Sequence, residues 1–94
     1  MPEMHFRIHW PNGVVETCYS PSLVIKDYFS AGQSYALADF VERSRTALTI
    51  ASDRVLAKYG YACSRAKAQL ARIESVAATF AGMPGACVTI DILE

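Results

Sequence analysis

A histidine, a glutamate and a cysteine near the N-terminus have the side chains that acid–base and nucleophilic chemistry uses. In the hairpin predicted below, His9 lies opposite Glu16, as a general base held by a carboxylate would. Cys18 lies diagonal to His9, where an activated thiol would lie. No third orienting group is apparent, and a cross-strand ion pair worth under about 1 kcal/mol is the simpler interpretation of His9 and Glu16. The three residues are therefore candidate catalytic residues without a complete site.

The same predicted sheet face carries further polar residues. His5 and Arg7 alternate with the core positions of the first strand, and Cys87 and Asp91 join them if the last strand lies beside the first. His5 and His9 are roughly 13 Å apart along a strand, too far to share a metal ion, and charged residues are ordinary on an open antiparallel face. We expect no metal and no cofactor, and we keep His5 and Arg7 as candidate ligand-binding residues.

The element that positions these residues is a hairpin. Residues 4–10 alternate between apolar and polar side chains, which predicts a strand buried on one face. Asn12-Gly13 is the favoured pair for a two-residue type I′ turn. This turn places Trp10, Ile8 and Phe6 opposite Val15, Thr17 and Tyr19 on the core side, and His9, Arg7 and His5 opposite Glu16, Cys18 and Ser20 on the outer side.

Three helices and a final strand follow. Ser20 and Pro21 begin a short helix that runs to about Phe29. Ser34 caps a long helix that ends before Gly60, and residues 64–80 form a third helix antiparallel to it. Residues 87–92 alternate as a strand. The sequence predicts one α+β domain over residues 1–94, with a three-stranded, mainly antiparallel sheet covered on one face by helices.

The long helix is apolar on two sides. One stripe is interrupted only by Ser44, and a second contains Phe40, Ala47 and Ile50. A helix that is apolar on two sides is usually covered on two sides. Either the sheet and the third helix cover both sides, or a partner protein or a second copy of the chain covers one of them. Aromatic residues such as Tyr28 and Tyr35 also gather around loops and helix ends. We expect these five residues to contribute to an interface, with a symmetric homodimer as the commonest arrangement.

Composition excludes several classes of protein. Nine Lys and Arg balance nine Asp and Glu, so the sequence gives no electrostatic reason to expect nucleic acid as a partner. It has neither a membrane-spanning apolar run nor a secretory signal, and we expect a cytoplasmic protein without membrane contact. The widely spaced Cys18, Cys63 and Cys87 fit neither a disulfide framework nor a CxxC motif. We interpret them as reduced thiols with packing roles.

Three stretches of the sequence, MHFRIHWPNG, CYSPSLVIKDYF and GQSYALADFVERSRTALTIASDRVLAKYG, resemble a family of small bacterial proteins named for a nitrogen-starvation response. The resemblance implies a gene cluster that also encodes a nitrilase, a radical SAM protein and an acetyltransferase-like protein, associated with nitrile or cyanide assimilation. It implies no catalytic residues.

Two functions remain open at this stage. The first is a non-catalytic accessory or regulatory protein that binds an enzyme of the same gene cluster, which fits the small size, neutral charge and surplus aromatics. The second is a small enzyme or small-molecule binder that uses His5, His9, Glu16 and Cys18 on the outer sheet face. A contiguous apolar surface favours the first, and a cleft over the histidine face favours the second.

Overall fold

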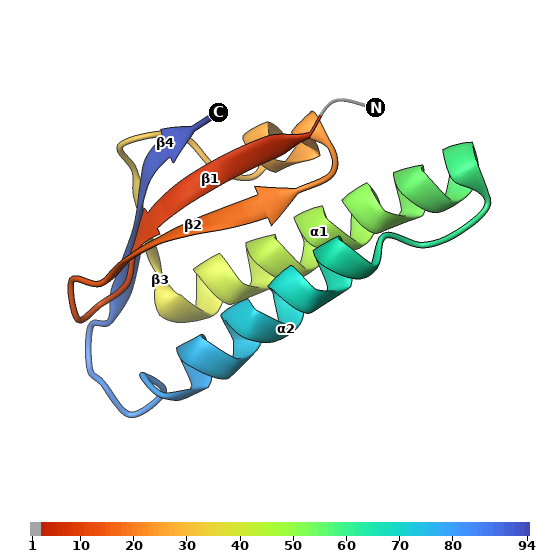
Figure 1. Cartoon of the computed structure of the whole chain (residues 1–94). Coiled ribbons are helices and arrows are strands. Elements are labelled where there is room, and N and C mark those ends of the chain that lie inside the picture. Colours follow the sequence, from red (N-terminus) through yellow and green to blue (C-terminus); the bar gives the residue numbers. More distant parts are fainter. Residues whose placement is uncertain (1–2) are drawn as a thin grey trace.

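A four-stranded antiparallel sheet lies over two long helices in the computed structural model, which describes residues 3–94 (Figure 1). The strands are β1 (Met4–His9), β2 (Val15–Ser20), β3 (Ser34–Ala36) and β4 (Cys87–Leu93), in the order β2-β1-β4-β3. The helices are the short 3₁₀ helix η1 (Leu23–Asp27), α1 (Leu37–Tyr59) and α2 (Ser64–Ala78). The predicted α+β class is confirmed, but the sheet has four strands rather than the three expected.

The missed strand, β3, occupies the positions predicted to begin the long helix. Ser34 does not cap that helix but pairs with Thr89 of β4, and the two hydroxyl oxygens are 2.8 Å apart. Helix α1 begins three residues later, where the amide of Leu37 donates to the carbonyl oxygen of Ala86 over 3.0 Å. A distant segment thus satisfies one of the amides that a helix leaves unpaired at its start. The sequence around Ser34 does not predict its pairing with β4.

The hairpin turn differs from the predicted one by a residue, which changes the register. Trp10 pairs with Val14, because its amide donates to the Val14 carbonyl oxygen over 2.9 Å, so the loop holds Pro11, Asn12 and Gly13. A type I′ turn requires positive φ at both central residues, and among the described residues only glycines have positive φ. The fixed φ of Pro11 instead suits the first central position of a type I turn, which Gly13 follows with a φ of 87°.

This register exchanges the two faces of β2. Phe6 lies opposite Cys18, and Ile8 lies opposite Glu16. Cys18 therefore points into the core, whereas Tyr19 and Thr17 lie on the outer face. Successive residues of a strand point to opposite faces, so a slip of one residue reverses every side chain. The predicted pairings of this hairpin are wrong for that reason.

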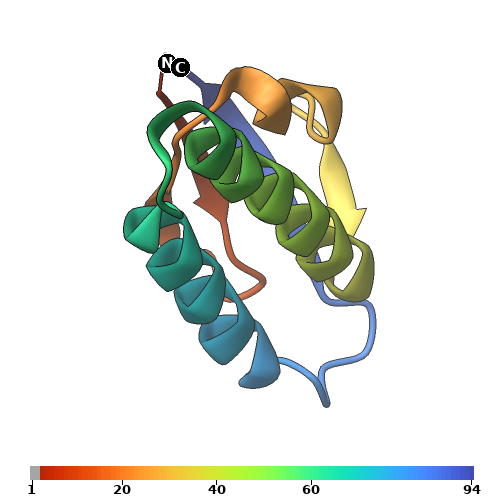
Figure 2. The same ribbon diagram turned by 90° about the vertical axis from the view of Figure 1, so that its right-hand side faces the viewer.

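The helices lie side by side under one face of the sheet and run in opposite directions (Figures 1 and 2). Gly60, with a φ of 83°, ends α1 as predicted, and its amide donates to the Leu56 carbonyl oxygen over 2.8 Å. Helix α2 begins at Ser64 as predicted but ends at Ala78, before the expected Phe80. The predicted antiparallel helical hairpin is confirmed.

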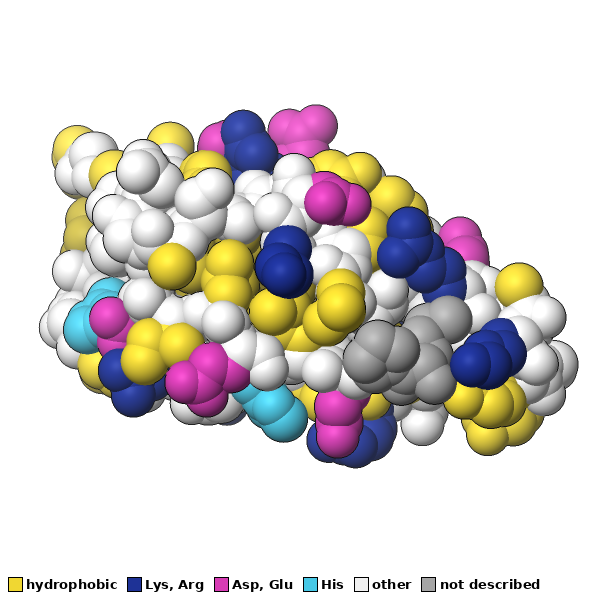
Figure 3. All heavy atoms as spheres, turned by 90° about the horizontal axis from the view of Figure 1, so that it is seen from above, with side chains coloured by type: hydrophobic (Ala, Val, Ile, Leu, Met, Phe, Trp, Pro, Cys, Tyr) yellow, Lys and Arg dark blue, Asp and Glu magenta, His cyan; other side chains and the backbone are white. Residues whose placement is uncertain are grey.

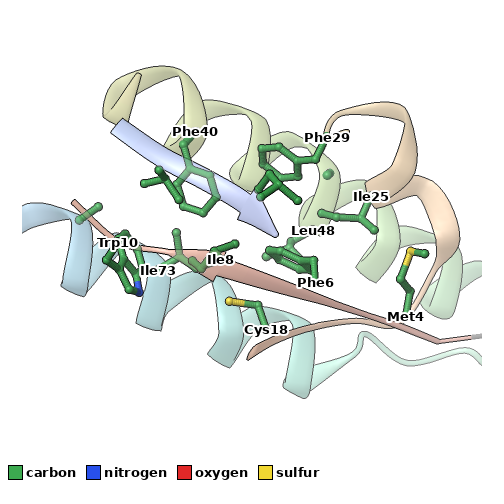
Figure 4. Close-up of a cluster of buried hydrophobic side chains, with 14 residues drawn as sticks. Met4, Phe6, Ile8, Trp10, Cys18, Ile25, Phe29, Phe40, Leu48 and Ile73 are labelled. Atoms are coloured by element: carbon green, nitrogen blue, oxygen red, sulfur yellow. The ribbon is translucent and has the colours of Figure 1, made fainter. Parts of the chain in front are cut away.

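Aromatic side chains fill the space between the sheet and the helices (Figure 4). The ring of Phe40 packs against Trp10 and Phe29, with ring centroids 5.6 Å and 5.4 Å apart. Phe40 and Ala47 are both 0% exposed, so the second apolar stripe of α1 is covered within this chain. These two predicted interface residues belong to the core.

Candidate functional site

The outer face of the sheet is left uncovered by the helices and carries both histidines (Figure 3). At its centre, Arg7 donates to Asp91 through Nε and Nη2, with distances to Oδ2 of 2.7 Å and 2.6 Å. His9 Nε2 lies 3.4 Å from the same oxygen. Because the hydrogen bond from Arg7, helped by His9, favours the carboxylate, the pKa of Asp91 lies below its ordinary value.

A β-bulge brings Asp91 to this cluster. Arg7 pairs with Ile92, but the next residue of β1, Ile8, pairs with Ile90, so Asp91 is the extra residue of β4. Sequence reasoning placed Asp91 on the outer face, and the structure does so. The bulge sets Asp91 beside Arg7 and His9, and nothing in the sequence of β4 predicts it.

The three predicted catalytic residues do not form a site. His9 lies on the outer face, whereas Glu16 lies on the helix side, where it accepts hydrogen bonds from the Trp10 indole over 3.1 Å and from Arg72 over 3.2 Å and 3.3 Å. Cys18 is 0% exposed and points into the apolar cluster (Figure 4). The proposed His9–Glu16 pair and activated Cys18 are therefore wrong.

Burial also removes the reactivity of the Cys18 thiol. Loss of solvation, together with the nearby charge of Glu16, raises the pKa of Cys18 to about 12. The thiol is thus neutral at physiological pH, whereas the thiolate is the nucleophile. All three cysteines are free; Cys18 has the predicted packing role, but Cys87 is exposed. Within residues 3–94, no three metal-ligating side chains lie close enough together to hold a metal ion.

His5 and Arg7, the candidate ligand-binding residues, are both exposed on the outer face. His5 packs edge-on against Tyr19, with ring centroids 5.9 Å apart. The other side of Tyr19 is taken by the guanidinium of Arg65, 3.8 Å from the ring centroid. Both candidates therefore interact with other residues of the same chain, Arg7 with Asp91 and His5 with Tyr19.

The remaining predicted interface residues are half-buried. The Tyr35 hydroxyl accepts from the Ser30 amide over 2.9 Å, and the Arg43 guanidinium lies 5.0 Å from the Tyr35 ring centroid. Arg43 also donates to the Tyr28 carbonyl oxygen over 2.9 Å. These contacts fix both tyrosines within the chain. Contact of Tyr28, Tyr35 and Ile50 with a partner stays a prediction.

An apolar hollow lies away from the histidines, where the start of α1, the end of α2 and the loop after α2 meet. It is an open groove of about 560 Å³. Small and apolar residues form most of its wall, and the ion pair of Arg45 with Glu74, 3.0 Å long, lies at its polar part. Its lining includes Ala38, Val41, Ala77, Ala78, Ala81 and Met83.

Sequence reasoning missed this groove, although one signal was present. The end of α2 and the following loop are rich in Ala and Gly, and Met83 is a large apolar residue in a loop. Small side chains leave room that larger ones would fill, and an exposed Met offers an adaptable apolar contact. The periodicity of α2 draws attention to its buried face, and not to this surface.

Comparison with known proteins identifies the family to which the chain belongs. No described helix is long and apolar enough to cross a membrane. No curated protein and no solved structure matches the sequence. The sequence model of the nitrogen starvation-induced protein NitG matches residues 5–93, which is nearly the whole chain. The chain therefore belongs to the NitG family of nitrogen starvation-induced proteins.

Proposed function

We propose that this chain acts by binding a partner protein, as a non-catalytic accessory or regulatory protein of nitrogen assimilation. The groove between α1 and α2 is the observation that carries the proposal. Its volume of about 560 Å³ lies in the range of binding pockets, and its lining is predominantly apolar. An apolar concave surface of this kind commonly marks a site of interaction.

The chemistry of the groove indicates what it binds. Its walls are side chains from two helices and a loop, so recognition relies on apolar side chains rather than on pairing with free backbone groups. An amphipathic helix that inserts its apolar face into a groove is a recurrent way to meet this requirement. The Arg45–Glu74 pair offers one charge of each sign beside the apolar floor. The occupant we propose is therefore an apolar helical segment with polar flanks.

The proposed partner is an enzyme of nitrile or cyanide assimilation, the process that the family resemblance implies. Membership of the nitrogen-starvation family supports the context of nitrogen limitation. The separation of His9 from Glu16 and Cys18 removes the arrangement on which the enzymatic alternative depended. A binding role is then the function that the geometry supports best.

The test is a substitution that blocks the groove without disturbing the core. Ala78 is exposed, lines the groove and ends α2, where a cation is favoured by the helix dipole. Ala78→Arg should therefore fold and obstruct the groove. Ala71→Arg is the matched control, because Ala71 is exposed on the same helix, two turns earlier and on the same side, but does not line the groove.

Tagged wild-type protein and both variants would be used to capture partners from nitrogen-starved cells. The partner is expected with wild type and Ala71→Arg but not with Ala78→Arg. Calorimetry with the purified partner should then show an affinity loss of at least about tenfold for Ala78→Arg alone. A partner that binds all three proteins equally, or a groove occupied only by a small metabolite in native mass spectrometry, would contradict the proposal.

A further inference from the structure

A second surface of the chain, independent of the groove, has unpaired backbone groups along the free edge of β2. We propose that a second copy of this chain pairs with β2 in antiparallel orientation, so that two four-stranded sheets join into one. The sequence led us to expect a symmetric dimer through α1, but Phe40 and Ala47 are buried within this chain. The proposed interface lies instead at β2, an edge strand of the sheet.

The hydrogen-bond pattern identifies the free groups. In an antiparallel pair, alternate residues of a strand bond to the neighbour and the others point away. Trp10 bonds to Val14, so the residues of β2 that point away from β1 are Val15, Thr17 and Tyr19. The Tyr19 amide donates to the Gln69 side chain of α2 over 3.0 Å, which confirms the outward direction. In the described part of the chain, Val15 and Thr17 have no backbone partner on this side.

The two edge strands of the sheet, β2 and β3, differ in how readily another strand could pair with them. Native proteins protect edge strands by keeping them short or by placing Pro or Lys in them. The edge strand β3 has only three residues, whereas β2 has six and contains neither Pro nor Lys. Val14, just before β2, is 54% exposed, and Val15, its first residue, is 48% exposed. The β2 edge is therefore longer than the β3 edge, lacks Pro and Lys, and is partly apolar, and Gln69 of α2 covers it only at the Tyr19 amide.

The edge is complementary to itself under two-fold symmetry. Pairing centred on Thr17 lets the two Thr17 residues exchange amide and carbonyl bonds, and it places Val15 of one copy opposite Tyr19 of the other. On the helix side, each copy contributes the ion pair of Glu16 with Arg72. The pair has no net charge, so this part of the edge does not repel a second copy of itself. Charge therefore favours a second copy over a strongly acidic or basic segment.

Space for the second strand exists beside this edge. A hollow of about 350 Å³ lies between β2 and the exposed side of α2, lined by Glu16, Tyr19, Arg65, Ala68, Gln69 and Arg72. The Tyr19 amide is already bonded to Gln69, so it is not available to the second copy. The expected bonds between the copies are therefore those that the two Thr17 residues exchange and those from the Val15 amide of one copy to the Tyr19 carbonyl oxygen of the other.

Thr17→Pro tests the inference directly. Its amide points away from β1, so proline removes a bond of the proposed interface without removing one from the hairpin, and proline is tolerated on such edges. Thr17→Ser keeps the amide and is the matched control. Sedimentation over a range of concentrations should show dimers for wild type and Thr17→Ser, and a dissociation constant at least about tenfold higher for Thr17→Pro, since symmetry removes the bond twice.

Two further measurements keep the test decisive. If Thr17→Pro fails to fold, Val15→Lys should weaken the dimer instead, because lysine on an edge opposes pairing. Hydrogen exchange at the Thr17 amide of wild type should slow as concentration rises. A wild type that stays monomeric, or that pairs only with another protein, overturns the inference. So does a dimer that folded Thr17→Pro leaves unchanged.

Discussion

Replacing Ser44 by alanine should stabilise the fold. Ser44 lies in α1, is fully buried, and its hydroxyl oxygen has no hydrogen-bond partner among the described residues. A buried hydroxyl without a partner costs about 1–3 kcal/mol, and alanine is favoured over serine in a helix by up to about 0.5 kcal/mol. The void left by one oxygen offsets these gains by about 0.5 kcal/mol. We expect a net gain of about 0.5–3 kcal/mol in the free energy of unfolding.

The assay is urea unfolding, in which Ser44→Ala should raise the midpoint at unchanged m-value, with a melting temperature higher by about 4–8 °C per kcal/mol. Ser75→Ala is the control, because Ser75 is exposed on α2 and its replacement gains only the helix propensity. A destabilised Ser44→Ala would refute the reasoning. It would mean that the hydroxyl bonds in solution, for instance to the carbonyl of Phe40 one turn earlier.

Three further predictions concern two cysteines and an aspartate. Because the pKa of Cys18 is about 12 when folded, above its unfolded value, its contribution to stability should be complete below about pH 8.5 and decline as the pH rises towards 12. An alkylating reagent at neutral pH should therefore modify exposed Cys87 readily and Cys18 only on unfolding. Because the pKa of Asp91 is lowered when folded, its contribution should be present above about pH 4 and lost as the pH falls through that lowered value. Melting temperatures of wild type and Asp91→Asn should differ at neutral pH and converge in acid, and an unchanged difference would contradict this role.

The sequence by itself determined the type and order of most elements. Alternation over residues 4–10 predicted β1, and the spacing of apolar residues predicted both long helices. Gly60 ends α1 where the sequence placed its end, because glycine adopts positive φ without strain. These features depend on residues that are neighbours along the chain. The α+β class and the helical layer on one face followed from them.

Tertiary structure decided the fourth strand and the binding surfaces, whereas the register of the hairpin was mispredicted for a local reason. The loop that contains Pro11 is one residue longer than the predicted turn. Because side chains alternate with a period of two, Cys18 and Glu16 therefore lie on the helix side of the sheet and not on its outer face. Strand β3 exists because β4 supplies its partner, and the groove exists because the end of α2 meets the start of α1. The fourth strand and the groove depend on which distant segments meet and on the volumes of their side chains. The local pattern of residues contains neither, and so the candidate site appeared only in the folded chain.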